Sequence, residues 1–205
     1  MDRFDYWADF INRQRIKAVT EIGVWRGQFA EHMLTHCPGI EQYNLVDPWR
    51  HLDDWNKPFN VDPQEFEDVY AEARLRTAPF SSKCKFLRGR TTEIDLPIVD
   101  FTYVDGDHTL RGITIDLIRA WPKTTWLGGD DFGEIWAHGP NHEPSLVKPF
   151  AVYFAEAVDA PFLLDGDQFL IGGEDGFSFP ETFGLLSSTA PRKRRRFLNR
   201  KVDFA

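Results

Sequence analysis

The order of its apolar segments is the feature that most constrains how this chain can fold. Five short apolar runs alternate with stretches in which apolar residues recur at helical spacing. The expected strands are residues 17–23, 43–47, 84–89, 99–106 and 124–131, followed by a hairpin within 162–173 that turns at Asp165-Gly166. The five runs lack the polar alternation of half-exposed strands, which indicates a parallel sheet covered on both faces.

This alternation predicts an α/β fold of the Rossmann-like, doubly wound type. We expect a mainly parallel seven-stranded sheet with a C-terminal antiparallel hairpin and helices on both faces. Residues 1–186 form a single domain that begins with an amphipathic helix over 1–16, and residues 187–205 form a basic, flexible tail. Asp62 followed by Pro63 marks the start of one of the helices, as N-cap and first helical residue.

Composition narrows the class of protein. A length of 205 residues with 42% hydrophobic residues supplies one core without disulfides, and the two cysteines, Cys37 and Cys84, form no CxxC motif. The N-terminal residues contain no apolar segment typical of a signal peptide, and no apolar run approaches the roughly 20 residues that span a bilayer. We therefore expect a cytoplasmic protein that does not span a membrane.

The net charge of −8 hides an uneven distribution. From Ser187 onward there are seven basic residues and one acidic residue, so the tail carries about +6 and the rest of the chain −14. An acidic body argues against general nucleic-acid binding and favours cationic ligands and metal ions. Nucleic acid would be a partner only through the tail, for which a solvated end is the simpler interpretation.

Acidic residues follow four of the five expected parallel strands. Such residues often cap the next helix, but in open α/β sheets this edge is also where ligands bind. The first strand leads into a glycine turn, E-x-G-x-x-x-G, whose Gly23 and Gly27 allow close approach of a ligand or simply a tight turn. Asp47 ends the next strand, at the place where an acid accepts hydrogen bonds from ribose hydroxyls. Together they indicate an adenosine-containing cofactor.

Four segments together resemble a known family: EIGVWRG at 21–27, VDPW at 46–49, VDGDH at 104–108 and GGDD at 128–131. They are similar to class I S-adenosylmethionine (SAM)-dependent methyltransferases, and more closely to the branch with macrolide-sugar O-methyltransferases and many surface-polysaccharide methyltransferases. The resemblance covers roughly residues 17–173. VDGDH and GGDD are its more specific part, because they mark metal-dependent members.

The resemblance implies a role for each matched residue. The implied cofactor contacts are Glu21, Gly23 and Gly27 for the methionine part, Asp47 for both ribose hydroxyls, Trp49 beside adenine, Arg90 and Thr91 on the adenine side, and Asp105. The implied ligands of a divalent cation, Mg²⁺ first, are Asp105, Asp130 and Asp131, and the implied general base is His108. The expected reaction is metal-assisted methyl transfer to a hydroxyl of a sugar or glycosylated small molecule.

Elementary chemistry supports this arrangement. Three clustered carboxylates repel one another, and a hard cation resolves the repulsion. A sugar hydroxyl is a poor nucleophile at neutral pH until metal binding lowers its pKa, and a nearby histidine, with an unperturbed pKa of about 6.5, can then take the proton. The plainer alternative is that His108 orients the helix that follows it.

The loop after Gly133 contains the expected acceptor-binding residues, Trp136, His138 and His142. The indole could stack on the apolar face of a sugar. The two histidines are spaced four residues apart, but Gly139-Pro140 between them breaks a helix, so they form no expected metal pair. Plain loop residues remain the simpler interpretation of all three.

Three alternatives stay open to different degrees. A catechol-type O-methyltransferase commonly has Asp-Asn where this chain has Asp130-Asp131. A nicotinamide-dependent reductase is disfavoured because the chain has no Tyr-x-x-x-Lys, and no P-loop or G-x-S-x-G motif supports an NTPase or a serine hydrolase. A non-catalytic binding protein would use the basic tail. The expected partner is a small-molecule or carbohydrate hydroxyl, and self-association through the N-terminal helix is left open.

Overall fold

The computed structural model describes residues 2–133 and 145–173. Its strands are β1 (Ala18–Ile22), β2 (Gln42–Asp47), β3 (Cys84–Arg88), β4 (Val99–Val104), β5 (Thr124–Gly129), β6 (Phe162–Asp165) and β7 (Gln168–Gly172). Its α-helices are α1 (Arg3–Gln14), α2 (Gln28–His36), α3 (Pro63–Thr77), α4 (Leu110–Ala120) and α5 (Val147–Ala157), with short 3₁₀ turns at Ala78–Phe80 and Trp121–Lys123.

The strands form one sheet in the order β3-β2-β1-β4-β5-β7-β6. Strands β1 to β5 run parallel, whereas β7 runs antiparallel to both β5 and β6. This confirms the predicted mainly parallel seven-stranded sheet with its C-terminal hairpin. The chain builds outward from β1 to β3 and then returns to β4 on the other side of β1. Ligands bind at such a switch point, outside the carboxyl ends of the central strands.

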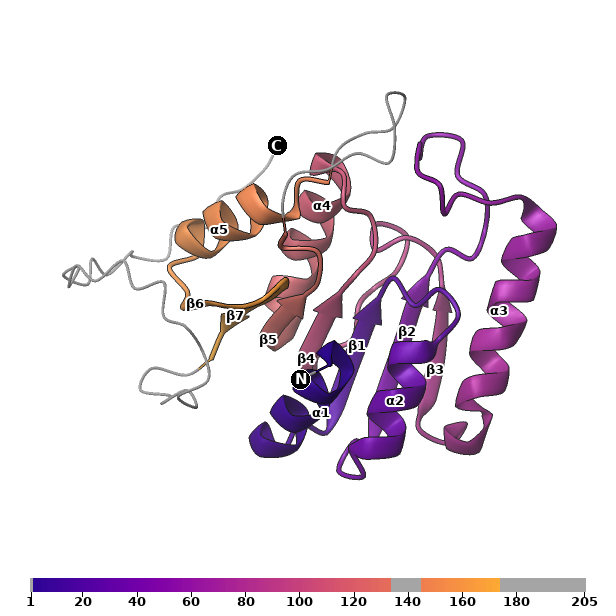
Figure 1. The fold of residues 1–205 in the computed structure, drawn as a ribbon, viewed down its shortest axis with the longest axis horizontal. Helices are drawn as coiled ribbons and strands as arrows, with labels where there is room; N and C mark the ends of the chain where they lie inside the picture. Colours follow the sequence, from indigo (N-terminus) through magenta and orange to yellow (C-terminus); the bar gives the residue numbers. More distant parts are fainter. Residues whose placement is uncertain (1, 134–144, 174–205) are drawn as a thin grey trace.

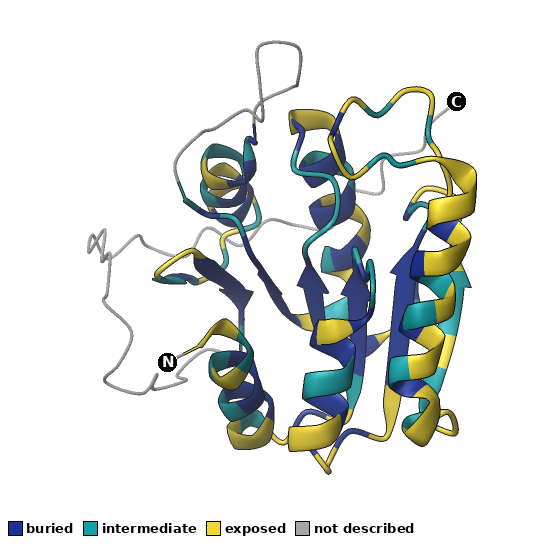
Figure 2. Cartoon of the chain, turned by 45° about the vertical axis from the view of Figure 1, so that its right-hand side comes forward, coloured by how far each residue is buried: buried dark blue, intermediate teal, exposed yellow. Residues whose placement is uncertain are grey.

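Helices cover both faces of the sheet, as predicted. Helices α1, α2 and α3 lie on one face, and α4 and α5 lie on the other (Figure 1). Each face has its own cluster of buried apolar side chains. Figure 2 shows the central strands buried between the helices, whereas the edge strands β3 and β6 are partly exposed. In the described part of the chain, no helix combines the length and the hydrophobicity needed to cross a bilayer.

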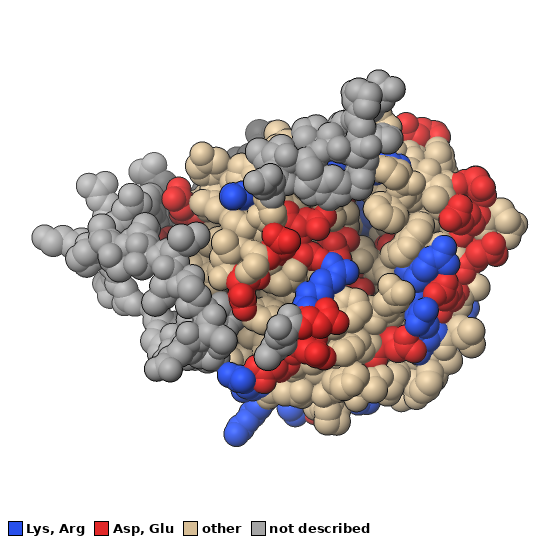
Figure 3. Space-filling model, in the orientation of Figure 1, with Lys and Arg blue, Asp and Glu red and all other residues tan. Residues whose placement is uncertain are grey.

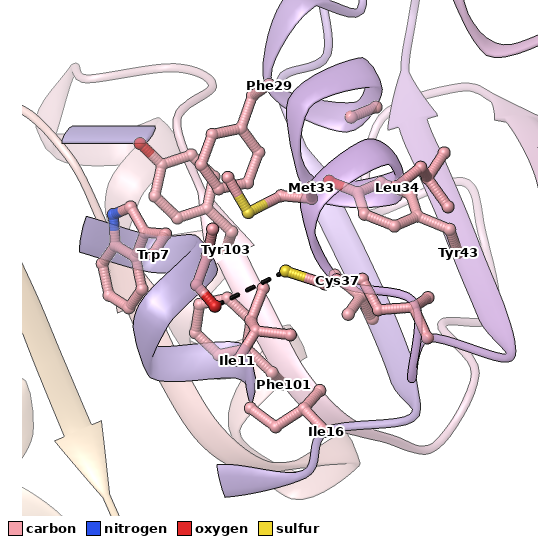
Figure 4. Packing of buried hydrophobic residues seen from close by; sticks show 14 of the residues in the cluster. Trp7, Ile11, Ile16, Phe29, Met33, Leu34, Cys37, Tyr43, Phe101 and Tyr103 are labelled. Atoms are coloured by element: carbon pink, nitrogen blue, oxygen red, sulfur yellow. Dashed lines mark hydrogen bonds between the residues drawn. The ribbon is translucent and has the colours of Figure 1, made fainter. Parts of the chain in front are cut away.

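Helix α1 is held by aromatic packing (Figure 4). The indole of Trp7 is fully buried, stacks on Phe101 with ring centres 5.1 Å apart, and donates a hydrogen bond of 2.7 Å to Gln168. A Cβ on Gly128 would lie 2.4 Å from the Trp7 ring, so the glycine makes room for the indole over β5. This packing brings the first residues of α1 to the carboxyl edge of the sheet.

Local capping residues determine where α3 and α4 begin, next to the carboxyl edge of the sheet. Asp62 accepts a hydrogen bond from the Glu65 amide at 2.9 Å and Pro63 begins α3, which confirms the predicted cap. Helix α4 is capped by Thr109, whose hydroxyl accepts from the Gly112 amide at 3.1 Å. Because α4 begins immediately after β4, residues 105–108 are confined to a short turn at the carboxyl end of that strand.

Candidate functional site

A cavity of about 580 Å³ opens at the carboxyl ends of β1, β2 and β4. Most of the predicted site residues line it: Glu21, Gly23, Asp47, Arg90, Thr91, Asp105, His108 and Asp131. Gly27, Trp49 and Asp130 are not among the lining residues. The three expected acceptor residues, Trp136, His138 and His142, and the basic tail lie outside the described residues.

The glycine turn closes directly onto the turn after β4. Gly23 has a φ of +89°, and a Cβ there would lie 2.2 Å from the carbonyl oxygen of Asp105, so only glycine fits. Gly27 has a φ of +76° and forms the N-cap of α2. The two turns therefore share one wall of the cavity, which places the β1 and β4 carboxylates near each other.

Glu21 is the buried acid of this wall. Its carboxyl accepts a hydrogen bond of 2.6 Å from the hydroxyl of Tyr43. Burial raises the pKa of Glu21 well above its usual value; the Tyr43 hydrogen bond opposes this, and the charges of Asp105 and Asp47 add to it. Because the buried carboxyl of Glu21 lines the cavity, a cationic or hydrogen-bond-donating ligand would be stabilised beside it.

Asp47 is occupied largely by the backbone. Its Oδ2 accepts from the amides of Val24 and Trp25, both at 3.0 Å, and its Oδ1 accepts from the Trp49 amide at 2.8 Å. Burial raises the pKa of Asp47 to about 6, against the effect of these hydrogen bonds. A carboxylate offers about four acceptor positions, so Asp47 ties the glycine turn to β2 and keeps little capacity for ribose.

Trp49 does not reach the cavity. Its ring is fully buried against Tyr70, with centres 4.9 Å apart, and its Nε1 donates to the carbonyl of Trp25 at 2.9 Å. The chain turns inward here because Trp49 adopts a positive φ of 41°. Trp49, the expected adenine contact, is therefore a core residue in this structure. The neighbouring wall of the cavity is formed by Arg90 and Thr91.

The loop between Trp49 and Asn60 covers this side of the cavity. The indole of Trp55 donates to Asp107 at 3.0 Å. Asp54 pairs with two arginines, Arg90 and Arg111, each with one contact of 2.9 Å. The loop is therefore tied both to the turn after β3 and to α4, and it closes this side of the cavity.

Asp105, His108 and Asp131 form a cluster at the other end of the cavity, with one ligand atom from each lying within 4.8 Å of the others. Nδ1 of His108 lies 2.7 Å from Asp131. Nε2 lies 3.4 Å from Asp105 and has no hydrogen-bond partner among the described residues. Burial alone lowers the pKa of His108, but the two adjacent carboxylates outweigh it and raise the pKa to about 9.

The adjacent Asp130 points elsewhere. It is buried, forms an ion pair with Arg3 of α1 and accepts a hydrogen bond from Gln168 of β7. Arg3 also lies 3.7 Å from Asp105. Asp131 has a positive φ of 59°, which turns its carboxylate back toward His108. The structure therefore brings together two of the three expected metal ligands, Asp105 and Asp131, with the imidazole of His108 between them.

This donor set fits a divalent cation. The carboxylates of Asp105 and Asp131 suit a hard cation such as Mg²⁺ or Mn²⁺, and Nε2 of His108 lies beside them without a hydrogen bond. Figure 3 shows acidic side chains gathered near the middle of this face with basic side chains next to them. The negative charge at the site is thus only partly balanced by the protein itself.

The chain matches no protein-family model and no curated protein. It does resemble solved structures. A Staphylococcus aureus protein proposed to be a caffeoyl-CoA O-methyltransferase superposes with a TM-score of 0.61 at 13% identity, covering 84% of this chain and 85% of that one. An O-methyltransferase from Bacillus cereus in complex with SAH gives 0.52 at 12%, covering 82% and 79%. A proposed RNA methyltransferase from Pyrococcus horikoshii gives 0.53 at 13%, covering 78% and 68%.

The chain has the methyltransferase Rossmann-like fold. At these identities the similarity establishes the fold alone. On this fold the cavity occupies the switch-point edge, and it contains residues that no motif revealed. Arg3, Trp55 and Asp116 all line it. Arg3 and Asp116 lie in helices whose sequence pattern indicates packing only, so no local signal could have identified them.

Proposed function

We propose that this chain is a SAM-dependent O-methyltransferase whose cofactor binds in the cavity and whose general base is His108. The observation that carries the proposal is the buried, unpartnered Nε2 of His108 at the cavity wall, beside the glycine turn of a methyltransferase fold. The carboxylates of Asp105 and Asp131 raise the pKa of this ring to about 9, and a cation held by them would offset that effect and leave Nε2 able to take a proton. The structural neighbours, two of them bound to SAH, support SAM as the cofactor.

Each wall of the cavity has a part in this reaction. SAM supplies an electrophilic methyl group on a positively charged sulfur. Glu21 and Gly23 hold its amino-acid end, and the acidic wall favours its charge. Asp131 fixes the ring of His108 through Nδ1, so that Nε2 faces the acceptor. The acceptor oxygen forms a bond to the methyl carbon, the carbon–sulfur bond breaks, and Nε2 takes the hydroxyl proton.

The proposal includes a divalent cation, Mg²⁺ first, held by Asp105 and Asp131. Such a cation lowers the pKa of an acceptor hydroxyl. Asp130, the third expected ligand, is engaged by Arg3 and Gln168 and would have to leave both to join the site. Its proposed contribution is therefore smaller than that of the other two aspartates.

The proposed acceptor is a hydroxyl of a sugar or a glycosylated small molecule. A phenolic hydroxyl is the second candidate, because the Staphylococcus aureus neighbour proposed to act on caffeoyl-CoA has the highest of the three TM-scores. The two classes differ in ring chemistry and in the pKa of the hydroxyl. A panel that contains both distinguishes them directly.

Calorimetry with SAH, followed by methyl transfer to that panel with Mg²⁺ or with EDTA, tests the proposal. We expect SAH binding, a product heavier by one methylene group, and loss of turnover in EDTA. Absence of SAH binding would overturn the enzyme assignment. Binding without turnover across the panel would favour a binding protein, and turnover in EDTA would remove the metal from the proposal.

A further inference from the structure

A buried carboxyl in the cavity has no part in the reaction described above. Asp116 lies on the inner side of α4, is 7% exposed and lines the cavity. Its Oδ1 accepts a hydrogen bond of 2.6 Å from the hydroxyl of Thr91. Thr91 is itself held in place, because Arg119 donates to its carbonyl at 3.1 Å. The carboxyl is thus fixed by contacts between α4 and the turn after β3.

The second oxygen of Asp116 is directed at the turn after β4. Oδ2 lies 3.5 Å from the position that a Cβ on Gly106 would occupy, and no described residue donates a hydrogen bond to it. Burial raises the pKa of Asp116 to about 7, while Thr91 and His108 lower it and Asp107 raises it. A carboxylate oxygen without a donor among the described residues, in a side chain that lines the cavity, is able to accept a hydrogen bond from a ligand bound there.

The position of Asp116 selects which part of the ligand it meets. SAM carries two kinds of strong nitrogen donor, the ammonium of its amino-acid end and the exocyclic amino group of adenine. The glycine turn and Glu21 stand where the ammonium is proposed to bind. Thr91 follows β3, Asp116 reaches it from α4, and both line the same cavity as Trp55.

We propose that Asp116, oriented by Thr91, accepts a hydrogen bond from the adenine amino group and makes the site select adenine over hypoxanthine. This inference rests on SAM being the ligand, and it assigns the base-reading role to a residue outside the matched motifs. Hypoxanthine has a carbonyl oxygen in place of the amino group. Above the pKa of about 7, where Asp116 is ionised, that oxygen would face the carboxylate with no hydrogen between them, so the site rejects hypoxanthine there and the binding comparison is made at about pH 8.5.

The substitution Asp116→Asn gives this idea a sharp test, because it preserves shape and changes only donors and acceptors. The amide oxygen would accept from Thr91, which leaves the amide NH₂ facing the base. An NH₂ group repels the amino group of adenine and donates to the carbonyl of hypoxanthine. The preference between the two bases should therefore reverse, which simple destabilisation of the protein would not produce.

The experiment is calorimetric titration of the full chain with SAH and with S-inosylhomocysteine, its hypoxanthine counterpart. We expect the unchanged protein to bind SAH about 10- to 100-fold more tightly. Asp116→Asn should reverse that order, and Thr91→Val should weaken it. The control is Asp95→Asn, the same chemical change at a side chain that is 94% exposed and pairs with Lys123 at 3.2 Å; it should leave the preference unchanged.

Equal binding of the two ligands by the unchanged protein would overturn the inference while leaving the proposed function intact. So would a folded Asp116→Asn variant, checked by thermal melting, that keeps the original preference. If that variant does not fold, the comparison in the unchanged protein and in Thr91→Val still decides. Failure of the unchanged protein to bind SAH would overturn both this inference and the proposed function.

Discussion

The two ends of the cavity use strand-end carboxylates in opposite ways. After β2, the oxygens of Asp47 are consumed by three backbone amides, so the acid organises the chain around it. After β4 and β5, Asp105 and Asp131 face each other across His108, and a ring nitrogen is left without a partner. The first end is satisfied internally and builds the pocket. The second is unsatisfied and is where chemistry is expected.

Removing the imidazole should have the largest effect on the reactive end. We expect His108→Ala to lower methyl transfer by about 10²- to 10⁴-fold, because the acceptor loses its base. SAH affinity should stay within a few-fold, since the proposed cofactor contacts, Glu21 and Gly23, are unchanged in this variant. Rates measured beside calorimetry check this, with the exposed His36→Ala as control. An unchanged rate would show that the two ends do not differ in this way.

The pH dependence of stability separates the two ends by the pH range over which each contribution is lost. The pKa of His108 is about 9 in the folded chain against an unperturbed 6.5. Its stabilising effect is therefore full below about pH 6.5 and is lost as pH rises through 9. We expect the difference in unfolding free energy between the unchanged protein and His108→Gln to shrink by up to about 3 kcal/mol over that window.

Denaturant titrations in EDTA measure this difference. Asp47 acts with the same sign at lower pH, because its folded pKa of about 6 also lies above the unfolded 3.8. Its contribution falls as pH rises from about 4 to 6, within a range where His108 contributes fully. A flat difference between pH 6.5 and 9 would contradict the charge balance assigned to the reactive end.

Replacing Asp47 or Asp105 by alanine should affect stability and turnover differently. Asp47→Ala leaves three amides of the glycine turn and its surroundings unpaired, so we expect a loss of about 2–3 kcal/mol in unfolding free energy and weaker SAH binding. Asp105→Ala relieves repulsion near Glu21 and Asp131, so stability should change little while turnover falls. Thermal melts and rates on both variants check this. Equal destabilisation would erase the contrast.

Asp130 and Asp131 are adjacent, so they compare an acid engaged by the protein with an acid of the proposed metal site. Asp131→Asn should weaken Mn²⁺ binding, followed by electron paramagnetic resonance, by about tenfold or more because a ligand charge is lost. Asp130→Asn should leave Mn²⁺ affinity nearly unchanged and instead loosen α1, visible as greater solvent exposure of the Trp7 indole. Stronger loss of Mn²⁺ in the Asp130 variant would restore it as the metal ligand.

Much of the architecture is local and was therefore predictable. The apolar runs, the Asp62-Pro63 helix start and the Asp165-Gly166 turn are short-range signals, and each corresponds to the observed element. His108 is three residues from Asp105, so a tight turn alone brings them close. The glycine turn was also predictable from its two glycines, and the structure shows that only glycine fits at position 23 against the Asp105 carbonyl.

The direction of side chains beyond a strand end was decided only by the tertiary structure. Asp130 and Asp131 are identical neighbours, yet one turns to Arg3 and Gln168, from the far ends of the described chain, and the other turns to His108. Trp49 entered the core, and Asp116 reached the cavity from α4 through its contact with Thr91.

The amino-acid sequence by itself determined the sheet, its acidic edge and the place of the cavity, because hydrophobic period and turn chemistry act over a few residues. Which acids face the ligand depends on single backbone angles and on partners more than a hundred residues away. Such contacts exist only once helices and strands have packed, so the tertiary structure alone distinguishes the acids that build the pocket from those that are free to act.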